Sequence, residues 1–271
     1  MSNEKQFLKG RVALVTGSGR GIGRALAGRL ASLGAAVAVH DIDQEAPTEF
    51  GEAESLNQVA EQIADIGSDT LAVTADLGKR DQVFAMSEEI KDVLGSVDIL
   101  VNNAGGDVGA GGGKPQPNDN VYISGEDVDA MFDRNLKSAI FCSQAVSPAM
   151  IEKEWGRIIN IASNAAFHGS PGGSMYAIAK AGVVHFTRCL ASQLRDHNVT
   201  VNCIAPGNTL TARFVNTREV DPDSLERTEG LNRLTLPEDL ANVVEFFVSD
   251  LASFVSGQVI SVDGGGRLVP G

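Results

Sequence analysis

The chain has 271 residues, of which 43% are hydrophobic and 21% are charged, and its formal net charge at pH 7 is −13. This composition is typical of a globular protein with a sizeable core, and the negative charge makes nucleic acid and anionic membranes poor partners. The first residues, MSNEKQFLKGRVALVTG, contain no basic segment followed by a long apolar run, and no stretch approaches the roughly 18 apolar residues of a membrane span. We therefore expect a cytoplasmic protein.

Seven short apolar runs, rich in β-branched residues, alternate with longer segments of helical spacing. The runs predict strands over residues 12–16, 36–40, 70–74, 98–102, 157–162, 199–205 and 258–262. Helical spacing is found over residues 21–34, 56–67, 83–95, 126–150 and 174–196. Because the strands are apolar throughout, they are expected to be covered on both faces. The β-α-β repetition predicts one α/β domain over residues 1–271, a doubly wound parallel sheet with helices on both faces.

The stretch TGSGRGIG, residues 16–23, follows the first predicted strand and opens the first predicted helix. A glycine pattern alone is a weak signal because most such clusters mark turns, but here the strand and the helix supply the context. Gly17 can turn the chain, and Gly21 and Gly23 allow the backbone and the helix to approach a pyrophosphate, for which the helix N-terminus offers free N–H groups. The sequence therefore predicts a dinucleotide-binding turn.

The second predicted strand is followed by Asp41, 18 positions after Gly23. A carboxylate at this place can accept hydrogen bonds from both hydroxyls of the adenosine ribose, and it would repel a 2′-phosphate. A turn aspartate is the alternative interpretation, and Arg20, a cation beside the glycine turn, argues mildly for the phosphate. The balance favours NAD over NADP.

Two segments interrupt the regular alternation of strands and helices. Residues 43–55 lengthen the link after the second strand and carry five acidic residues, which predicts a solvated surface insert. Residues 105–119, GGDVGAGGGKPQPND, follow the fourth strand; strands continue on both sides, so a linker between domains is disfavoured. Because loops beyond the carboxyl ends of strands bind ligands in such folds, we expect this loop to border the active site or to contact a neighbouring subunit.

Tyr176 and Lys180 are four residues apart in a strongly periodic segment and therefore share one face of a helix. A nearby ammonium group favours the phenolate and can bring a tyrosine into the range of a useful base, although most such pairs are ordinary surface neighbours. Ser163 ends the fifth predicted strand, at the sheet edge where a hydroxyl can polarise a carbonyl. Asn135 lies in the predicted helix 126–150, where it either holds a water against Lys180 or is a helix-interior polar residue.

Taken in chain order, these motifs resemble the short-chain dehydrogenase/reductase family, whose domain is Rossmann-like. TGSGRGIG, TADL around Asp76, NNAG at 102–105, Asn135, Ser163, Tyr176 with Lys180, and PGNTLT at 206–211 occur in family order and cover nearly the whole chain. The resemblance implies Tyr176 as the acid/base, Ser163 as the group that polarises the substrate, Lys180 as the group that lowers the tyrosine pKa and binds the ribose, and Asn135 as the anchor of a proton-relay water.

The resemblance also implies a set of residues in contact with the cofactor. They are Gly17, Ser18, Gly19, Arg20, Gly21, Ile22 and Gly23 of the turn, Asp41 at the ribose, Asp76 and Leu77 at the adenine, Asn103, Ala104 and Gly105, the catalytic Tyr176 and Lys180, and Pro206, Thr209 and Thr211 by the nicotinamide amide and pyrophosphate. Three departures from the family pattern stand out: the long loop after NNAG, the acidic insert, and Thr209 where an apolar residue is common. The resemblance further implies a homo-oligomer, a dimer or tetramer, and residues 208–235 are expected to form a lid over the substrate.

The substrate is expected to be a small molecule with a polar secondary alcohol or ketone, and a sugar, polyol or sugar acid fits best. Asn164, His168, Asn208, Asp107 and Lys114 are candidate pocket residues, whose hydrogen bonds a steroid or long acyl chain would leave unmatched. One alternative is an NADPH-dependent 3-oxoacyl-(acyl-carrier-protein) reductase, although an acidic carrier protein should dock poorly on an acidic surface. A non-catalytic cofactor-binding regulator is the alternative of another class, and the intact Ser163, Tyr176 and Lys180 argue against it.

The three cysteines Cys142, Cys189 and Cys203 lie in apolar segments, with neither CxxC spacing nor a nearby histidine cluster. We expect buried free thiols and no metal site.

Overall fold

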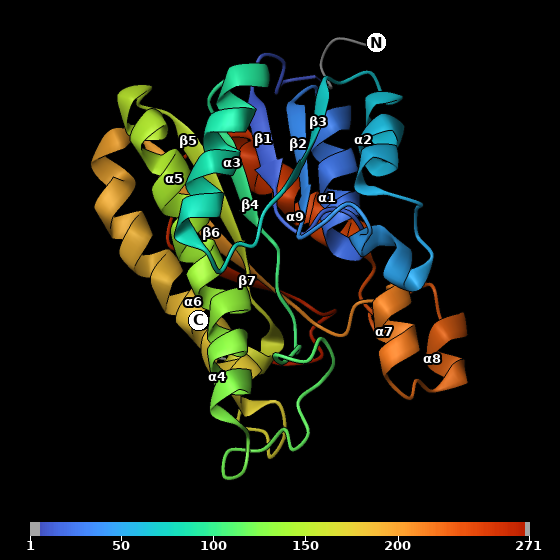
Figure 1. Ribbon diagram of the computed structural model, residues 1–271. Coiled ribbons are helices and arrows are strands. Elements are labelled where there is room, and N and C mark those ends of the chain that lie inside the picture. The colour runs from blue at the N-terminus through green and yellow to red at the C-terminus, as the bar shows by residue number, and fades with distance from the viewer. Residues whose placement is uncertain (1–5, 269–271) are drawn as a thin grey trace.

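The computed structural model describes residues 6–268, which form a three-layer α/β sandwich around a seven-stranded parallel sheet (Figure 1). The strand order is β3-β2-β1-β4-β5-β6-β7, and every pair of neighbours is parallel. The strands are β1 (Val12–Val15), β2 (Ala36–Asp41), β3 (Thr70–Thr74), β4 (Ile99–Asn102), β5 (Gly156–Ile161), β6 (Val199–Pro206) and β7 (Val259–Val262). The predicted doubly wound sheet is confirmed, and each predicted strand is present to within a residue or two.

The α-helices are α1 (Gly21–Ser32), α2 (Leu56–Ala64), α3 (Arg80–Val93), α4 (Gly125–Phe132), α5 (Ser138–Glu152), α6 (Ser174–Leu194), α7 (Ala212–Thr217), α8 (Pro222–Glu226) and α9 (Pro237–Val248). Short 3₁₀ or π segments are η1 (Ala46–Phe50), η2 (Asp133–Lys137), η3 (Asn164–Phe167), η4 (Arg195–His197) and η5 (Asp250–Ala252). The helix predicted over residues 126–150 is confirmed as an uninterrupted helical stretch, in which the π segment η2 joins α4 to α5.

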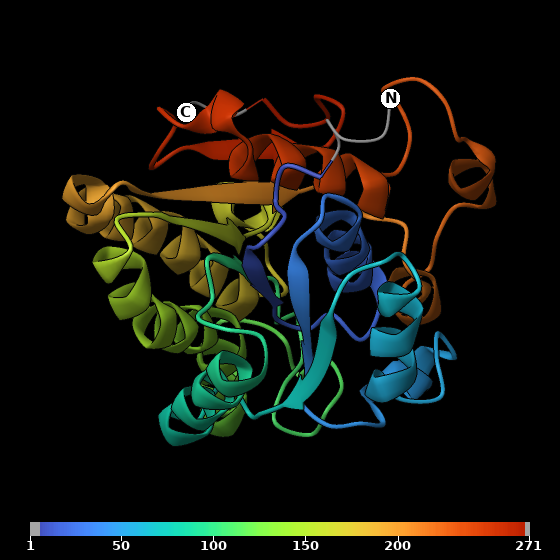
Figure 2. The same cartoon turned by 90° about the horizontal axis from the view of Figure 1, so that it is seen from above.

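Two hydrophobic layers hold the helices against the sheet. Leu26 and Leu30 of α1 pack with residues of α2 and α9 on one face, and the residues of α3, α5 and α6 form a separate cluster on the other (Figure 2). The strands between these layers are apolar on both sides, as the continuous apolar runs predicted. Helix α9 had no counterpart in the sequence prediction, although it begins at Pro237 and has Glu238 and Asp239 in its first turn, which are typical signals of a helix start.

A buried polar network fixes α6 against the middle of the sheet. The Asn102 side-chain amide donates to Asn160 Oδ1 at 2.8 Å, and the Asn160 amide donates to Thr187 Oγ1 of α6 at 2.9 Å. Buried amides without partners would destabilise the fold, so these bonds specify the position of the helix along β4 and β5. Tyr176 and Lys180 occupy the N-terminal half of the same helix, which the network therefore orients.

The carboxyl ends of β1 and β4 mark the point where the strand order reverses, and this is where such sheets bind ligands. Residues 16–23 follow β1, and residues 105–124 follow β4. The loop after β4 and the pair α7 and α8 both extend beyond this end of the sheet, at the bottom of Figure 1. In the described residues no helix is long and apolar enough to cross a membrane.

Candidate active site

The turn at residues 16–23 requires glycine at specific positions. Gly17 has a left-handed backbone with φ of 61°, and a Cβ there would lie 2.9 Å from Ala104 Cα. At Gly23 a Cβ would lie 2.1 Å from Gly17 O and 2.6 Å from Asn103 Nδ2. Asn103 Nδ2 in turn donates to Gly17 O at 3.0 Å and to Thr16 O at 2.9 Å. The two segments predicted to border the cofactor, TGSGRGIG and NNAG, thus lock each other in place.

A buried histidine, which sequence reasoning missed, supports the same turn. His40 Nδ1 accepts from Gly17 N at 3.2 Å, and its Nε2 lies 3.1 Å from Ala75 O, to which it donates in that tautomer. Ser18 Oγ accepts from His40 N at 2.9 Å. Burial lowers the pKa of His40 to about 4, so the ring is neutral near pH 7. The sequence did offer a signal for His40. Neighbouring residues of a strand point to opposite faces of the sheet, so the residue directly before Asp41 could have been expected to point to the other face.

Asp41 lies at the end of β2, beside the glycine turn. Its Oδ2 is 2.8 Å from the position that a Cβ on Gly19 would take, and its Oδ1 accepts from Ile42 N at 2.9 Å. Burial raises the pKa of this carboxyl. A carboxylate held at the second strand, next to a turn that approaches so closely, is the arrangement that recognises ribose hydroxyls in this type of sheet.

The acidic insert lies on the surface, as expected, with Asp43, Glu45, Glu49 and Glu54 exposed, and it is also bonded to the glycine turn. Arg20 Nη1 donates to Ala46 O at 2.8 Å and to Glu49 Oε2 at 2.5 Å, so its guanidinium points into the insert. Glu52 Oε2 accepts from Gly21 N at 2.8 Å, and Glu52 Oε1 is buried without a partner in residues 6–268. The physical reason is that the N-terminus of α1 offers free N–H groups, which attract a carboxylate as they would a phosphate.

The remaining predicted cofactor residues are spread around the same end of the sheet. Asp76 Oδ1 accepts from Gly78 N at 3.0 Å, in the turn between β3 and α3, and Leu77 is buried beside it. Thr211 caps α7 and its methyl group lies 3.4 Å from where a Cβ on Gly21 would be. Thr209 is buried and bridges to Thr235. The other three lie on the same elements: Ile22 in the first turn of α1, Gly105 at the end of NNAG and Pro206 at the end of β6.

The predicted catalytic residues come from β5, α6 and η2. Ser163 follows β5, and its Oγ accepts from Ala165 N at 3.2 Å. Lys180 is buried, its Nζ donates to Ile161 O at 2.8 Å, and the same Nζ lies 5.9 Å from the centre of the Tyr176 ring. Burial lowers the pKa of Lys180 to about 8. The helix places Tyr176 and Lys180 on one face, as their spacing predicted.

The environment of Tyr176 combines opposing effects. Burial raises the pKa of its phenol, and interaction with the Ser163 hydroxyl lowers it. The positive charges of Arg218 and Arg213 also lower this pKa, while the negative charge of Asp107 raises it. Sequence reasoning had given the lowering of this pKa to Lys180 and had not considered the two arginines, which lie in the region predicted as the lid.

Asn135 ties the loop after β4 to the helices. Its Oδ1 accepts from Gly106 N at 2.8 Å, and its Nδ2 donates to Gly106 O at 3.0 Å and to Met131 O at 2.9 Å. The π segment η2 places this side chain so that it satisfies both backbone groups of Gly106. Asn135 therefore fixes where the loop begins.

The candidate pocket residues do not form one cluster. Asp107 accepts from the Asn118 amide at 3.2 Å, and Asn208 Oδ1 accepts from Arg218 Nη1 at 3.3 Å. Asn164 instead donates to Asp263 Oδ2 at 2.6 Å, away from solvent. His168 and Lys114 are exposed, and His168 Nδ1 lies 3.0 Å from the backbone carbonyl of residue 164.

The described residues contain no group of three or more His, Cys, Asp or Glu that could hold a metal ion. Cys142 and Cys203 are buried, as expected, and burial raises the pKa of Cys142 to about 12 and that of Cys203 to about 11. Cys189 is exposed, which corrects the expectation for this residue, because its position on α6 faces solvent.

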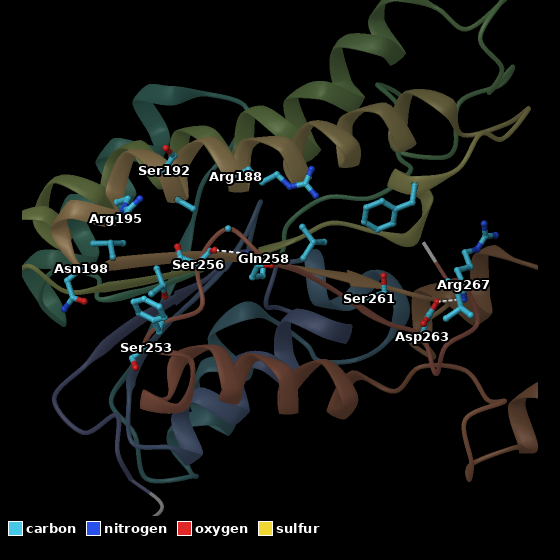
Figure 3. A pocket seen from close by; sticks show the side chains of 18 of the residues that line it. Arg188, Ser192, Arg195, Asn198, Ser253, Ser256, Gln258, Ser261, Asp263 and Arg267 are labelled. Carbon is cyan, nitrogen blue, oxygen red and sulfur yellow. Dashed lines mark hydrogen bonds between the residues drawn. The ribbon is translucent and has the colours of Figure 1, made fainter. Parts of the chain in front are cut away.

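A pocket elsewhere on the molecule is distinct from this site. It lies along the outer edge of β7 and the C-terminal half of α6, where Arg188 and Ser192 of α6 and Arg195 of η4 face Ser256 and Gln258 (Figure 3). None of the four predicted catalytic residues lines it. Ser163, Tyr176 and Lys180 lie instead where β5 and the N-terminal half of α6 meet, at the carboxyl end of the sheet.

Comparison with known proteins decides the family. The family model of the short chain dehydrogenases matches residues 11–221. The chain belongs to this family. It is accordingly an oxidoreductase that acts on CH–OH groups with a nicotinamide cofactor, as the predicted motifs implied.

Individual relatives of this short-chain dehydrogenase cover nearly the whole chain. The (2S)-[(R)-hydroxy(phenyl)methyl]succinyl-CoA dehydrogenase subunit BbsD of Thauera aromatica is 38% identical over 97% of this chain and 99% of its own length. A cyclohexanol dehydrogenase of Rhodococcus sp. strain TK6 is 39% identical over 95% of this chain and 96% of its own. The solved structure of a 7α-hydroxysteroid dehydrogenase complexed with NADH and 7-oxo glycochenodeoxycholic acid has a TM-score of 0.83 and 34% identity, and covers 98% of both chains.

Proposed function

We propose that this enzyme is an NAD-dependent dehydrogenase that transfers a hydride between its cofactor and a small polar secondary alcohol or ketone, a sugar, polyol or sugar acid. The observation that carries the substrate class is the charge around the reacting phenol: Arg218, Asp107 and Arg213 all act on the pKa of Tyr176. A substrate that is apolar along its length would leave Arg213 without a partner, because within residues 6–268 its side chain forms no ion pair and donates no hydrogen bond, whereas Asp107 and Arg218 are bonded to Asn118 and Asn208.

The residues of the site fit a nicotinamide dinucleotide. The glycine turn brings the N-terminus of α1 within reach of a pyrophosphate, with Thr211 3.4 Å from the place of a Cβ on Gly21. Asp41 would accept the hydroxyls of the adenosine ribose, which supports NAD over NADP because the same carboxylate repels a 2′-phosphate. Arg20 does not oppose this preference, since Ala46 O and Glu49 already occupy its guanidinium.

The chain's own residues supply the proton chemistry. When bound, the nicotinamide accepts the hydride in alcohol oxidation and donates it in ketone reduction. Tyr176 takes the hydroxyl proton in oxidation and returns it in reduction, and Ser163 donates a hydrogen bond to the substrate oxygen. Lys180, whose pKa burial lowers to about 8, holds a proton with its Nζ 5.9 Å from the centre of the Tyr176 ring. Asn135 keeps the loop wall in place through Gly106.

We also propose that the enzyme is a homo-oligomer in which β7 and α6 lie at an interface. Strand β7 is an edge strand with one unpaired side, and the pocket of Figure 3 runs along it. Phe254 and Leu251, at the same edge of the molecule, are exposed. Edge strands and large exposed apolar side chains favour association. A cytoplasmic location stays a prediction.

The central test is Tyr176→Phe, assayed with NAD and a panel of polyols, sugars and sugar acids. Loss of a general acid/base should lower kcat by roughly 10²- to 10⁴-fold, with NAD affinity within about twofold of the native protein. Turnover of bulky apolar alcohols alone would contradict the substrate class, and a clear preference for NADPH would favour the acyl-carrier-protein reductase instead. A biological output that persists in the variant would point to a regulator.

A further inference from the structure

Arg213, in the first turn of α7, lies against the start of the loop that follows β4. A Cβ on Gly106 would lie 2.6 Å from Arg213 Nη1, 2.9 Å from its Nη2 and 3.0 Å from its Cζ. The guanidinium plane thus packs on the backbone at Gly106, whose φ is 146°. Asn135 bonds both the N–H and the carbonyl of Gly106, so the surface beneath the guanidinium is fixed.

This guanidinium is partly buried and lacks a carboxylate partner. Within residues 6–268, Arg20, Arg29 and Arg233 each form an ion pair at 2.5 or 2.6 Å, whereas Arg213 forms no ion pair and its side chain donates no hydrogen bond. Burial lowers the pKa of Arg213, which expresses the cost of keeping the charge away from water. A desolvated cation of this kind is stabilised when an anion completes the site.

The charge of Arg213 is felt at the reacting phenol. Arg213 lies in the first turn of α7 and Arg218 directly follows the last residue of this helix. The positive charges of both arginines lower the pKa of Tyr176. Arg218 is exposed, its Cζ lies 5.0 Å from the centre of the Phe214 ring, and its Nη1 donates to Asn208 Oδ1 at 3.3 Å. A substrate whose hydroxyl meets Tyr176 would therefore have two guanidinium groups in its surroundings, of which Arg218 acts more strongly on the phenol and Arg213 is the one without a hydrogen-bond partner in residues 6–268.

We propose that Arg213 binds a carboxylate of the substrate, so that this enzyme acts on a small hydroxy acid and its keto acid rather than on a neutral polyol. The inference rests on the proposed function, which it narrows. Arg218 adds a second positive charge for the outer part of the same anion. In the oxidation the carbinol C–H bond breaks, its hydride passes to the nicotinamide, and the hydroxyl proton passes to Tyr176 as the C=O bond forms; the carboxylate is unchanged.

Anions of another origin could meet the same guanidinium. The cofactor pyrophosphate is one, because Arg20 and Glu49, beside the glycine turn, also act on the pKa of Arg213. The charges of Tyr176 and Asp107 act on this pKa less than those of Arg20 and Glu49 do. The packing favours the substrate, because the guanidinium lies on Gly106, past the end of NNAG and at the start of the loop that Asn135 holds. The pyrophosphate has its own donors at the N-terminus of α1.

The experiment compares acids with neutral partners of the same skeleton. Steady-state kinetics with NAD would be measured for gluconate against glucitol and for 3-hydroxybutanoate against its methyl ester, using the native enzyme, Arg213→Ala, Arg213→Lys and Arg227→Ala. Arg227 is the matched control, because it is an exposed arginine of the same region that donates only to Asn232 O at 3.1 Å. NAD affinity would be measured separately by titration calorimetry.

The native enzyme should prefer the acid of each pair. Arg213→Ala should raise KM for the acid by roughly 10- to 100-fold, as expected for the loss of a charge-assisted hydrogen bond, and should change KM for the neutral partner by no more than about twofold. Arg213→Lys should be intermediate because it keeps the charge but loses the bidentate geometry. The control should match the native enzyme, and NAD affinity should be unchanged throughout.

Three results would overturn the inference. They are equal use of acids and neutral partners by the native enzyme, an unchanged preference in Arg213→Ala, and a tenfold loss of NAD affinity in that variant, which would assign the residue to the cofactor. If no compound of either class is turned over, the proposed function fails. Carboxylate binding by Arg213 is then tested by a binding measurement alone. The probe is 2-hydroxy-2-methylpropanoate, which has no carbinol hydrogen: with NAD present it should bind the native protein, and equal binding to Arg213→Ala would overturn the inference.

Discussion

The two segments that interrupt the regular alternation of this chain differ in how they are fastened. The insert at 43–55 is bonded to the glycine turn through Arg20 and through Glu52, which accepts from Gly21 N at 2.8 Å. The loop at 105–119 is held by Asn135 at Gly106, by Asn118 at Asp107 and by Asp127 at Ala110, whereas the triple glycine at its tip, Gly111 to Gly113, has no neighbour within 4 Å of any added Cβ.

This difference separates the two halves of the cleft. On the cofactor side the glycine turn is bonded to His40, to Asn103 and to Glu52 of the insert, so a change in any of these contacts is transmitted to the turn. On the substrate side the loop can vary at its tip without disturbing Gly106, because the fixed part ends where Ala110 meets Asp127 and an added Cβ on Gly111, Gly112 or Gly113 meets nothing within 4 Å. The bonded turn is suited to holding one ligand in one geometry. The loop with its unsupported tip allows the substrate specificity to change while the predicted catalytic residues stay in place.

The largest effect is expected when the same methyl group is added to each of the two regions, once in the glycine turn and once at the tip of the loop. Gly23→Ala would put a Cβ 2.1 Å from Gly17 O, so backbone must move, whereas Gly111→Ala meets nothing within 4 Å. We expect Gly23→Ala to cost about 3 kcal/mol of stability, since overpacking of this kind is expensive, and to weaken NAD binding. Gly111→Ala should change neither. Thermal unfolding and NAD titration would measure both, and equal effects at the two sites would refute the distinction.

A second test measures how the free energy of unfolding depends on pH through His40, which supports the glycine turn on the cofactor side. Burial lowers the pKa of His40 from 6.5 to about 4, so the folded protein favours the neutral ring. The stability that this neutral ring contributes is complete above pH 6.5 and is lost as the pH falls through the folded pKa. The loss between pH 6.5 and pH 4 should approach about 3 kcal/mol. Urea unfolding of native protein and His40→Gln should show this part of the pH dependence in the native protein only; parallel curves would contradict it.

The generic parts of the site were predictable because chain order and spacing carry them. The seven strands, the turn at Gly17, and the pairing of Tyr176 with Lys180 follow from hydrophobic runs and from helical periodicity. The remaining features depend on contacts between distant segments. No local pattern shows that Glu52 reaches Gly21 or that Arg213 packs on Gly106, because each pair is joined only by the fold.

The third prediction concerns the fastening of the insert. The Glu52 carboxylate bonds Gly21 N, at the helix N-terminus that a pyrophosphate would use. Glu52→Ala should therefore tighten NAD binding, by roughly threefold to tenfold if one carboxylate near a helix N-terminus contributes about 0.7–1.4 kcal/mol. Glu54→Ala removes the same charge from the same insert, at an exposed residue, and is the matched control. Weaker NAD binding in Glu52→Ala alone would mean that this carboxylate helps to hold the cofactor.

The smallest effect is expected from shortening the loop at its tip. Deletion of Gly111, Gly112 and Gly113 removes the bonds from Gly109 N to Gly113 O and from Gly112 N to Gly109 O, but leaves those of Asp107 with Asn118 and of Asn135 with Gly106. Because the cofactor side has no contact with this tip, NAD affinity should stay within about twofold, while KM for the substrate or the oligomeric state should change modestly, by a factor of roughly 2 to 10 for KM. Calorimetry, kinetics and light scattering would measure the three quantities together. A loss of NAD affinity without any change in KM or assembly would show that the tip acts on the cofactor after all, and that the two halves of the cleft are coupled through Gly106.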